Sequence, residues 1–261
     1  GPDVSSLTHA IKYFAGFSST GARAGEGRGL ARPLFGPCQR FRRKGEVLDV
    51  ERISRVIGAV RAEGRILLSE PEALDVLRAA GVPVVPTERA ADPGEAAAAA
   101  ERVGLPVVLK MVSADLPHKT EAGAVAAGLK TPEEVKRAAE EMDSRVRALR
   151  PDAELQGFAV QPMAEGVETL ASATADPLFG PVLAFGLGGV WVELLEDVAL
   201  RLAPVGPDDV DEMLGEIKGR KLLDGFRGGP PADRDALRQT LLRLSDLAWT
   251  FADDIAEVEI N

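Results

Sequence analysis

The sequence has very few of the residues that build disulfide, thiol and imidazole chemistry. Its 261 residues include one cysteine, Cys38, and two histidines. A single cysteine cannot form an intramolecular disulfide, which excludes a small secreted scaffold held by several such bonds. Long apolar runs are absent too, and none approaches the roughly 20 residues that a membrane-spanning helix needs. We therefore expect a cytoplasmic protein with no membrane partner.

Positive charge is in deficit, because 31 lysines and arginines face 41 acidic residues and leave a net charge of −10. This balance argues against nucleic acid as the main partner. The exception is residues 1–45, where eight basic residues against two acidic ones give +6. That stretch is rich in glycine and serine and shows no sustained hydrophobic period. We expect it to be a disordered extension or a linker.

The remaining sequence alternates between helical and strand patterns, which predicts an α/β or α+β fold. Caps and apolar spacing predict helices at 70–80, 93–103, 132–149, 208–217 and 232–251. Short apolar runs bounded by glycine and proline predict strands at 82–85, 107–111, 124–129, 158–163, 167–174, 182–186, 198–202 and 255–261.

The most informative stretch is 107–125, in which a buried strand pattern holds Lys110 and a polar loop leads to a second strand. A strand–loop–strand unit of this kind suits a phosphate chain, because loop N–H groups and lysines can face the anion. His118 lies in that loop between a proline and a lysine. It is either an ordinary surface histidine or a functional one.

Residues 256–261, the last six of the chain, alternate between apolar and oxygen-bearing side chains. Glu257, Glu259 and Asn261 would share one face of a strand. Such a set of oxygen atoms is suited to Mg²⁺. The same pattern also describes the solvent-facing edge of an amphipathic strand.

Several stretches together resemble the ATP-grasp β subunit, or β-like domain, of the NDP-forming acyl-CoA synthetases, which share a superfamily with succinyl-CoA synthetase. They are LLSEPEALDVLRAAGVPV, GLPVVLKMVSADLPHKTEAGAV, AVQPMAEGVE, ADPLFGPVLAFGLGGVWVELLEDVALRLAP, LLDGFRGGPPADRDAL and EVEIN, in the family's order. The resemblance implies an α+β, two-lobed ATP-grasp fold with the nucleotide site between the lobes. The lobes would be residues 46–162 and 163–261.

The resemblance also implies a set of nucleotide-binding residues. Lys110 would contact the phosphates, which agrees with the need of a buried lysine for an anionic partner. The loop from Ser113 to Gly123 would cover the phosphates, with Lys119 as a second cation. The segment from Gln161 to Met163 would be the hinge beside adenine. Glu168 would reach the ribose or phosphates, unless it is only an exposed strand residue.

By the same resemblance, His118 takes the phosphoryl group inside the ATP-grasp subunit. A neutral imidazole is nucleophilic near pH 7, and its phosphoramidate can pass the group onward. Glu259 matches a glutamate that faces the partner's phosphohistidine, and with Asn261 it also matches the magnesium ligands of ATP-grasp enzymes. These two roles of Glu259 compete.

The sequence departs from the family pattern at three places. Ala124 stands where a second glycine is usual, and Glu121 replaces an aspartate. The chain also ends at Asn261, where the family continues into another strand. We therefore expect an exposed sheet edge and a metal site with fewer ligands.

The function implied is one half of an ADP-forming acyl-CoA synthetase reaction, acyl-CoA + ADP + phosphate ⇌ carboxylate + CoA + ATP. ATP or ADP and Mg²⁺ would be the cofactors. A CoA-binding α subunit or fused α domain would bring the small carboxylic acid and CoA, as part of a hetero-oligomer or a longer chain. Two alternatives are a non-catalytic sensing domain of a lysine acetyltransferase and an ATP-grasp carboxylate–amine ligase. The latter would not need His118.

Overall fold

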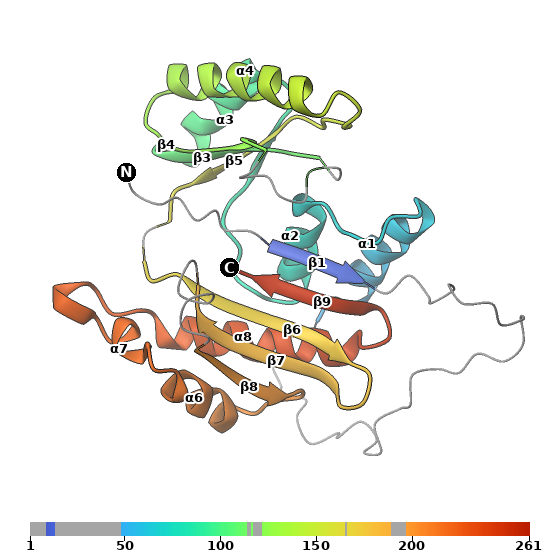
Figure 1. Ribbon diagram of the computed structural model, residues 1–261, viewed down its shortest axis with the longest axis vertical. Helices are drawn as coiled ribbons and strands as arrows, with labels where there is room; N and C mark the ends of the chain where they lie inside the picture. The colour runs from blue at the N-terminus through green and yellow to red at the C-terminus, as the bar shows by residue number, and fades with distance from the viewer. Residues whose placement is uncertain (1–8, 14–47, 114–115, 117–121, 165, 189–196) are drawn as a thin grey trace, which may run out of the picture. The chain divides into compact units, whose positions relative to one another are not determined.

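The structure is a computed structural model that describes residues 9–13, 48–113, 116, 122–164, 166–188 and 197–261. The described residues form two compact units, each with its own sheet (Figure 1). The first unit spans residues 84–165, and the second combines residues 7–83 with residues 166–261. In the part of the chain that is described, no helix has both the length and the apolar character needed to cross a membrane.

The first unit is a four-stranded antiparallel sheet with two helices on one face (Figure 1). Its strands β2 (Glu88–Ala90), β3 (Val107–Met111), β4 (Val125–Leu129) and β5 (Phe158–Pro162) lie in the order β2-β5-β3-β4. The helices are α3 (Pro93–Val103) and α4 (Pro132–Leu149). Alternate residues of β3 and β5 pack against apolar faces of both helices and form the core of this unit.

Local signals explain where these helices begin. The side chain of Asp92 accepts hydrogen bonds from the backbone N–H groups of Gly94 and Glu95 at the start of α3. Thr131 caps α4 by accepting from the N–H of Glu134 at 3.2 Å. Proline follows each cap at the first helical position, where its missing N–H costs nothing.

The second unit contains a five-stranded antiparallel sheet in the order β1-β9-β6-β7-β8. Its strands are β1 (His9–Tyr13), β6 (Thr169–Asp176), β7 (Gly180–Leu187), β8 (Val198–Leu202) and β9 (Ile255–Ile260). One face packs on α8 (Arg234–Thr250), which runs along β6, β7 and β9, while α6 (Pro207–Glu216) packs against α8 and β8. Leu183, Phe185 and Val258 are fully buried in this layer.

Two further helices belong to this second unit. Helix α1 (Val50–Ala62) packs against α2 (Glu70–Ala79). A capping box marks the start of α2: Glu72 accepts hydrogen bonds from the N–H and the hydroxyl of Ser69 at 2.7 and 2.8 Å. Glu72 also pairs with Arg65 at 2.7 Å. Burial alone would raise the pKa of Glu72, but the hydrogen bonds from Arg65 and Ser69 outweigh it and lower that pKa.

The N-terminal stretch differs from the disordered extension or linker that its composition predicts. Five of its residues, His9–Tyr13, form β1 and pair antiparallel with β9. Strand β9 therefore lies between β1 and β6, and it is not the exposed edge that the expected loss of a strand implies. Composition could not reveal this pairing, because the two strands are more than 240 residues apart in sequence.

Most of the predicted helices and strands are present within two or three residues of their expected bounds. The strand expected at 82–85 is wrong, and β2 lies six residues further on. Pro83 and Pro86 explain the difference, because proline cannot donate a hydrogen bond to a neighbouring strand. Helix α1 was not expected, although Ile53, Ile57 and Val60 are buried at helical spacing.

The contacts within the chain divide it differently from the lobes expected at 46–162 and 163–261. Residues 48–83 group with the second sheet, and the first unit begins at Val84. Two contacts account for this grouping: α2 lies against β1, and Arg61 of α1 pairs with Asp254 beside β9 at 2.8 Å. The later boundary, at residue 165, lies close to the expected one.

The replacement Glu72→Gln tests the cap of α2. We expect the free energy of unfolding at pH 7 to fall by about 1 kcal/mol, because a charged cap and the pairing with Arg65 are both weakened. The folded pKa lies below the unfolded value of about 4.3, so the wild-type advantage is complete above that pH and shrinks as pH falls through the folded pKa. Urea denaturation at pH 7 and pH 3 measures both effects.

The matched control is Glu63→Gln, because Glu63 also pairs with Arg65 but is 60% exposed. We expect that variant to lose no more than about 0.5 kcal/mol. An equal gap between wild type and Glu72→Gln at both pH values would contradict the account.

Candidate nucleotide site

Lys110 lies on the central strand β3 of the first unit, where its partners are Val125 of β4 and Ala159 of β5. The neighbouring residues Leu109 and Met111 point into the core beneath α3 and α4. Alternation along the strand directs Lys110 to the other face of the sheet. Even so, only 2% of Lys110 is exposed. Lys110 is therefore not a lysine that reaches solvent at a strand end, and a cation this deeply buried requires an oxygen or anionic partner.

The expected hinge forms the end of β5 next to this lysine. Gln161 pairs with Val108, which lies two residues before Lys110 on β3. Residues two apart on a strand share a face, so Gln161 lies on the same sheet face as Lys110. Its side-chain amide is 2% exposed and donates to the hydroxyl of Thr87 at 2.9 Å. Met163 follows the strand, and its N–H donates to the carbonyl of Pro106 at 3.0 Å. The structure thus brings Lys110 and Gln161 to one face and holds the hinge backbone in place.

The loop between β3 and β4 is described at its two ends. His118 and Lys119 lie outside the described residues. Ser113, two residues after β3, is buried. At the other end Gly123 has a positive φ of 64°, and its carbonyl accepts a hydrogen bond from Arg145 of α4 at 3.2 Å. The loop therefore leaves and returns at fixed points of the sheet.

In the second unit, Glu259 lies on β9 directly opposite Ser172 of β6 and Ala10 of β1. Glu259 and Asn261 alternate with Val258 and Ile260, as the sequence pattern predicts. Gly188, just after β7, lies so close to Asn261 that a Cβ on it would be 2.7 Å from the amide oxygen. The end of β9 and the end of β7 therefore meet at one end of the sheet.

These residues fit a magnesium ion in the number and type of their atoms. Mg²⁺ uses one or two protein carboxylates and takes its other ligands from phosphates and water. Glu259 and Asn261 supply one carboxylate and one amide. The backbone of Gly188 lies close to the amide oxygen, where a Cβ would be 2.7 Å away. Among the described residues, no three histidine, cysteine, aspartate or glutamate side chains gather into a site of their own.

Glu168 precedes β6 and is exposed. Its carbonyl accepts a hydrogen bond from the N–H of Gly188 at 2.9 Å. Glu168 therefore lies at the same end of the sheet as Asn261. The strand expected at 167–174 begins two residues later than predicted, which leaves Glu168 in the connection and not within the strand.

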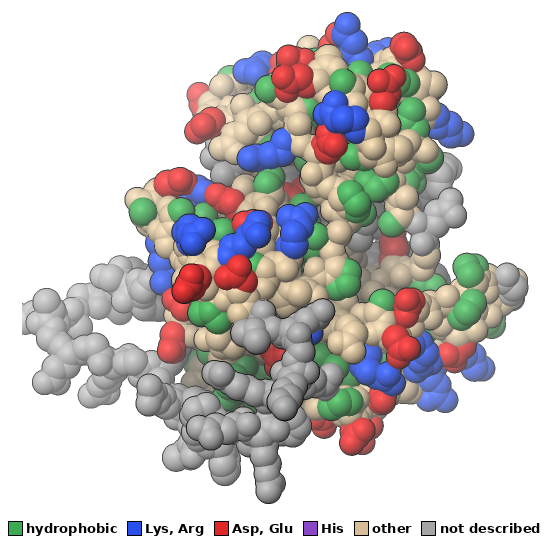
Figure 2. Space-filling model, turned by 180° about the vertical axis from the view of Figure 1, so that it is seen from behind, with side chains coloured by type: hydrophobic (Ala, Val, Ile, Leu, Met, Phe, Trp, Pro, Cys, Tyr) green, Lys and Arg blue, Asp and Glu red, His purple; other side chains and the backbone are tan. Residues whose placement is uncertain are grey.

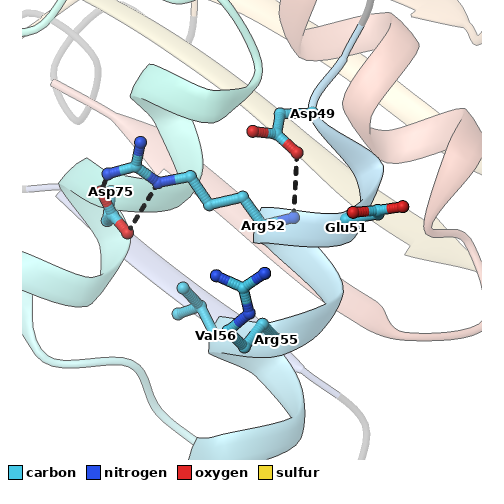
Figure 3. A pocket seen from close by; sticks show the side chains of 6 residues that line it. All are labelled: Asp49, Glu51, Arg52, Arg55, Val56 and Asp75. Atoms are coloured by element: carbon cyan, nitrogen blue, oxygen red, sulfur yellow. Dashed lines mark hydrogen bonds and ion pairs between the residues drawn. The ribbon is translucent and has the colours of Figure 1, made fainter.

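A hollow that the sequence did not predict lies on the second unit between α1 and α2 (Figure 3). Arg52 bridges it by donating to both carboxylate oxygens of Asp75, and its N–H donates to Asp49. The first interaction raises the pKa of Arg52. The guanidinium of Arg55 also lies against this hollow. Because its charges are mainly paired with one another and exposed, we assign the hollow to the packing of the two helices.

Comparison with known proteins identifies the family. Residues 59–261 match the family model described as the ATP-grasp domain. The β subunit of ADP-forming acetate–CoA ligase II of Pyrococcus furiosus is 40% identical over 219 residues, which cover 84% of this chain and 90% of that subunit. The chain belongs to the ATP-grasp family, in the branch of the ADP-forming acyl-CoA ligase β subunits.

A second relative carries the same domain within a longer chain. The 4-hydroxybutyrate–CoA ligase (ADP-forming) of Nitrosopumilus maritimus is 36% identical, and the match covers 79% of this chain but only 30% of that protein. The chain thus spans almost all of a β subunit and less than a third of this single-chain ligase.

Solved structures confirm the ATP-grasp fold. Acetyl-CoA synthetase 1 of Candidatus Korarchaeum cryptofilum, in complex with CoA, Ca-AMPCP and HgCl⁺, superposes with a TM-score of 0.76 at 36% identity. That match covers 79% of this chain and 98% of the other. A second structure of that enzyme, with CoA and Mg-AMPPCP, has its phosphohistidine segment pointing towards the nucleotide-binding site and gives a TM-score of 0.68.

The contact between Gly123 and Arg145 can be tested with two glycine substitutions. A Cβ at position 123 would lie 2.9 Å from the Arg145 side chain, whereas one at Gly128, with φ of 73°, meets nothing within 4 Å. Both Gly→Ala changes impose a left-handed backbone on alanine, at about 1 kcal/mol each. Gly123→Ala should cost about 1 kcal/mol more, because Arg145 must move and lose its hydrogen bond.

Urea denaturation of both variants measures this difference, first with Arg145 present and then in an Arg145→Ala background. The two glycine substitutions should become equally costly once Arg145 is removed. Equal costs with Arg145 present would show that the contact between Gly123 and Arg145 contributes nothing to stability.

Proposed function

We propose that this chain is the nucleotide-binding and phosphoryl-transfer half of an ADP-forming acyl-CoA synthetase. The reaction is acyl-CoA + ADP + phosphate ⇌ carboxylate + CoA + ATP. The observation that carries this proposal is the 40% identity with a ligase β subunit over 90% of its length. The buried Lys110 on the central strand of the first unit supports it independently.

Lys110 and Gln161 have distinct parts in this proposal. Their common sheet face holds one cation and one amide, both nearly inaccessible to water. Lys110 binds the phosphate chain, since an ammonium group shielded from water interacts strongly with an anion. The backbone after Gln161, fixed by the hydrogen bond from Met163 to Pro106, offers its polar groups to the adenine edge. Ser113, Lys119 and Gly123 belong to the loop that covers the phosphates.

His118 carries the phosphoryl group. A neutral ring nitrogen attacks the γ-phosphorus of ATP, so an N–P bond forms as the O–P bond to ADP breaks. The group then passes to a histidine of the α partner, which uses it to activate the carboxylate for attack by CoA. In the opposite direction the same steps make ATP. Such transfers depend on alignment and charge neutralisation, which Lys110 and the loop supply.

Glu259 and Asn261 are the residues that would hold Mg²⁺. The ion would neutralise charge on the phosphate oxygens during transfer. Glu259 lies next to Val258 of the same strand, and Val258 is fully buried. The strand that carries Glu259 is therefore firmly held. Glu168, at the same end of the sheet, would act on the ribose or the phosphates.

A partner must complete the reaction, because relatives of this chain are named as β subunits. We infer that the partner is a CoA-binding α subunit or α domain that also receives the carboxylic acid. The ligase names of these relatives favour a catalytic role over a sensing one. We place the activity in the cytoplasm, where ATP and CoA are available.

Replacement of Lys110 by methionine tests the assignment, since methionine keeps the length of the side chain and removes the charge. We expect the affinity for ATP with Mg²⁺ to fall by about ten- to a hundred-fold, equivalent to roughly 1.5–3 kcal/mol. Acyl-CoA formation with the α partner should fall with it at subsaturating ATP. Isothermal calorimetry and a CoA-thioester assay measure the two effects.

Lys130→Met is the matched control, because Lys130 is an exposed lysine of the same unit. It should bind ATP as wild type does. Unchanged affinity in Lys110→Met would remove that lysine from the site. A wild-type chain that binds ATP but forms no thioester with its partner would favour the sensing role.

A further inference from the structure

A basic and aromatic loop projects from the second unit between α6 and α8 (Figure 1). It comprises residues 218–230 and includes the short helix α7 (Arg220–Leu223) and the turn η2 (Phe226–Gly228). Phe226 is 51% exposed, and Lys218, Arg220, Lys221 and Arg227 are exposed as well. At the lower right of Figure 2, Lys and Arg side chains lie beside acidic ones, with hydrophobic side chains close by.

The charge of this loop is opposite to that of the chain as a whole. Four basic residues and one aspartate, Asp224, lie between positions 218 and 227, in a chain with a net charge of −10. Asp224 is bound to Arg234 at 2.6 Å. Within the described part of the chain, no ion pair engages Lys218, Lys221 or Arg227. The loop therefore presents cations that remain available to an anionic surface.

The base of the loop is held rigidly. Both carboxylate oxygens of Asp197, a buried residue, accept hydrogen bonds at 2.8 Å from the backbone N–H groups of Lys218 and Gly219. Gly219 lies so close to Leu187 of β7 that a Cβ on it would be 2.2 Å from the leucine side chain. On the other side of the loop, the N–H of Ala232 donates to the carbonyl of Leu223 at 2.9 Å.

The tip of the loop is strained where it displays its side chains. Arg227, with φ of 52°, is the one non-glycine residue with a positive φ among those described. Its guanidinium lies 5.4 Å from the centre of the Phe226 ring. Gly225 permits the turn, since a Cβ there would be 2.7 Å from the carbonyl of Gly229. Backbone strain of this kind persists where the surrounding structure enforces it, and it concentrates at functional sites.

The loop lies at the end of the second sheet where β7 and β9 end. Gly219 contacts Leu187, the last residue of β7, and the next residue, Gly188, lies against Asn261. A protein bound to this loop would therefore reach the end of the sheet that carries Glu259 and Asn261. Arginine and exposed aromatic residues are also the side chains most enriched at the centres of protein interfaces.

We propose that the loop of residues 218–230 is a docking site for the α partner, with Phe226 and Arg227 entering an apolar and acidic surface of that protein. The proposal rests on the function proposed above, because it takes the partner from there. The location favours this occupant, because it places a bound protein beside the residues through which the phosphoryl group would be handed over.

The test measures binding of the separately purified α subunit by biolayer interferometry. Arg227→Glu and Phe226→Ala should each weaken binding at least about tenfold. Arg227→Gly should weaken it to a similar extent, while its melting temperature stays equal to or above that of wild type because glycine relieves the positive φ. If Arg227 only stabilised the loop, Arg227→Gly would bind the partner as wild type does and would melt at a lower temperature. Raising salt should weaken wild-type binding more than that of Arg227→Gly.

Phe179→Ala and Arg55→Ala are matched controls, since Phe179 is 63% exposed and Arg55 is an exposed arginine elsewhere on the unit. Both should bind the partner within twofold of wild type. Calorimetry with ATP on every variant separates this proposal from the function, because loop variants should keep full nucleotide affinity. Arg227→Glu binding the partner within twofold of wild type would overturn the proposal. A loop variant that binds the partner as wild type does but sediments as a smaller species than wild type would also overturn it, because the loop would then contact a second copy of the chain.

Discussion

The burial of one cation, Lys110, is the constraint on which the proposed site depends. It lies on the middle of a strand whose other residues form the core, so the fold itself delivers the ammonium group to a nearly inaccessible position. Desolvation of a lysine costs several kcal/mol unless oxygen atoms or an anion compensate. In the proposed site, a phosphate chain would be one such anion. In the same proposed site, Gln161 on the same face and the loop that starts beyond Met111 would bind the same nucleotide.

The second unit contributes through close backbone contacts. Gly188 and Gly219 each lie where a side chain would collide, with Asn261 and with Leu187 respectively. These contacts pull three segments distant in sequence to one end of the sheet. Asp197 adds two hydrogen bonds that fix the turn before α7. A metal ion, a phosphoryl group and a docked partner would each require such fixed geometry, because transfer between two histidines tolerates little misalignment.

Local signals made much of the fold predictable from the sequence. The caps of α2, α3 and α4, the β3 pattern around Lys110 and the alternation in β9 are each encoded within a few neighbouring residues, and each is present. Long-range contacts were not predictable in this way. The pairing of β1 with β9 and the hydrogen bond between Gln161 and Thr87, 74 residues apart, depend on the assembled chain. The strand expected at 82–85 failed because its prolines outweigh its apolar character.

The most direct test of the account is transfer of phosphate from [γ-³²P]ATP to the chain in the presence of Mg²⁺. A phosphohistidine is labile in acid and stable in base, which distinguishes it from phosphoserine and from acyl phosphate. The account predicts an acid-labile label on the wild-type chain that is absent from His118→Ala, although that variant still binds ATP. The label should leave when the α partner is added. A wild-type chain that binds ATP but stays unlabelled, or a His118→Ala chain that is labelled equally, would contradict the relay.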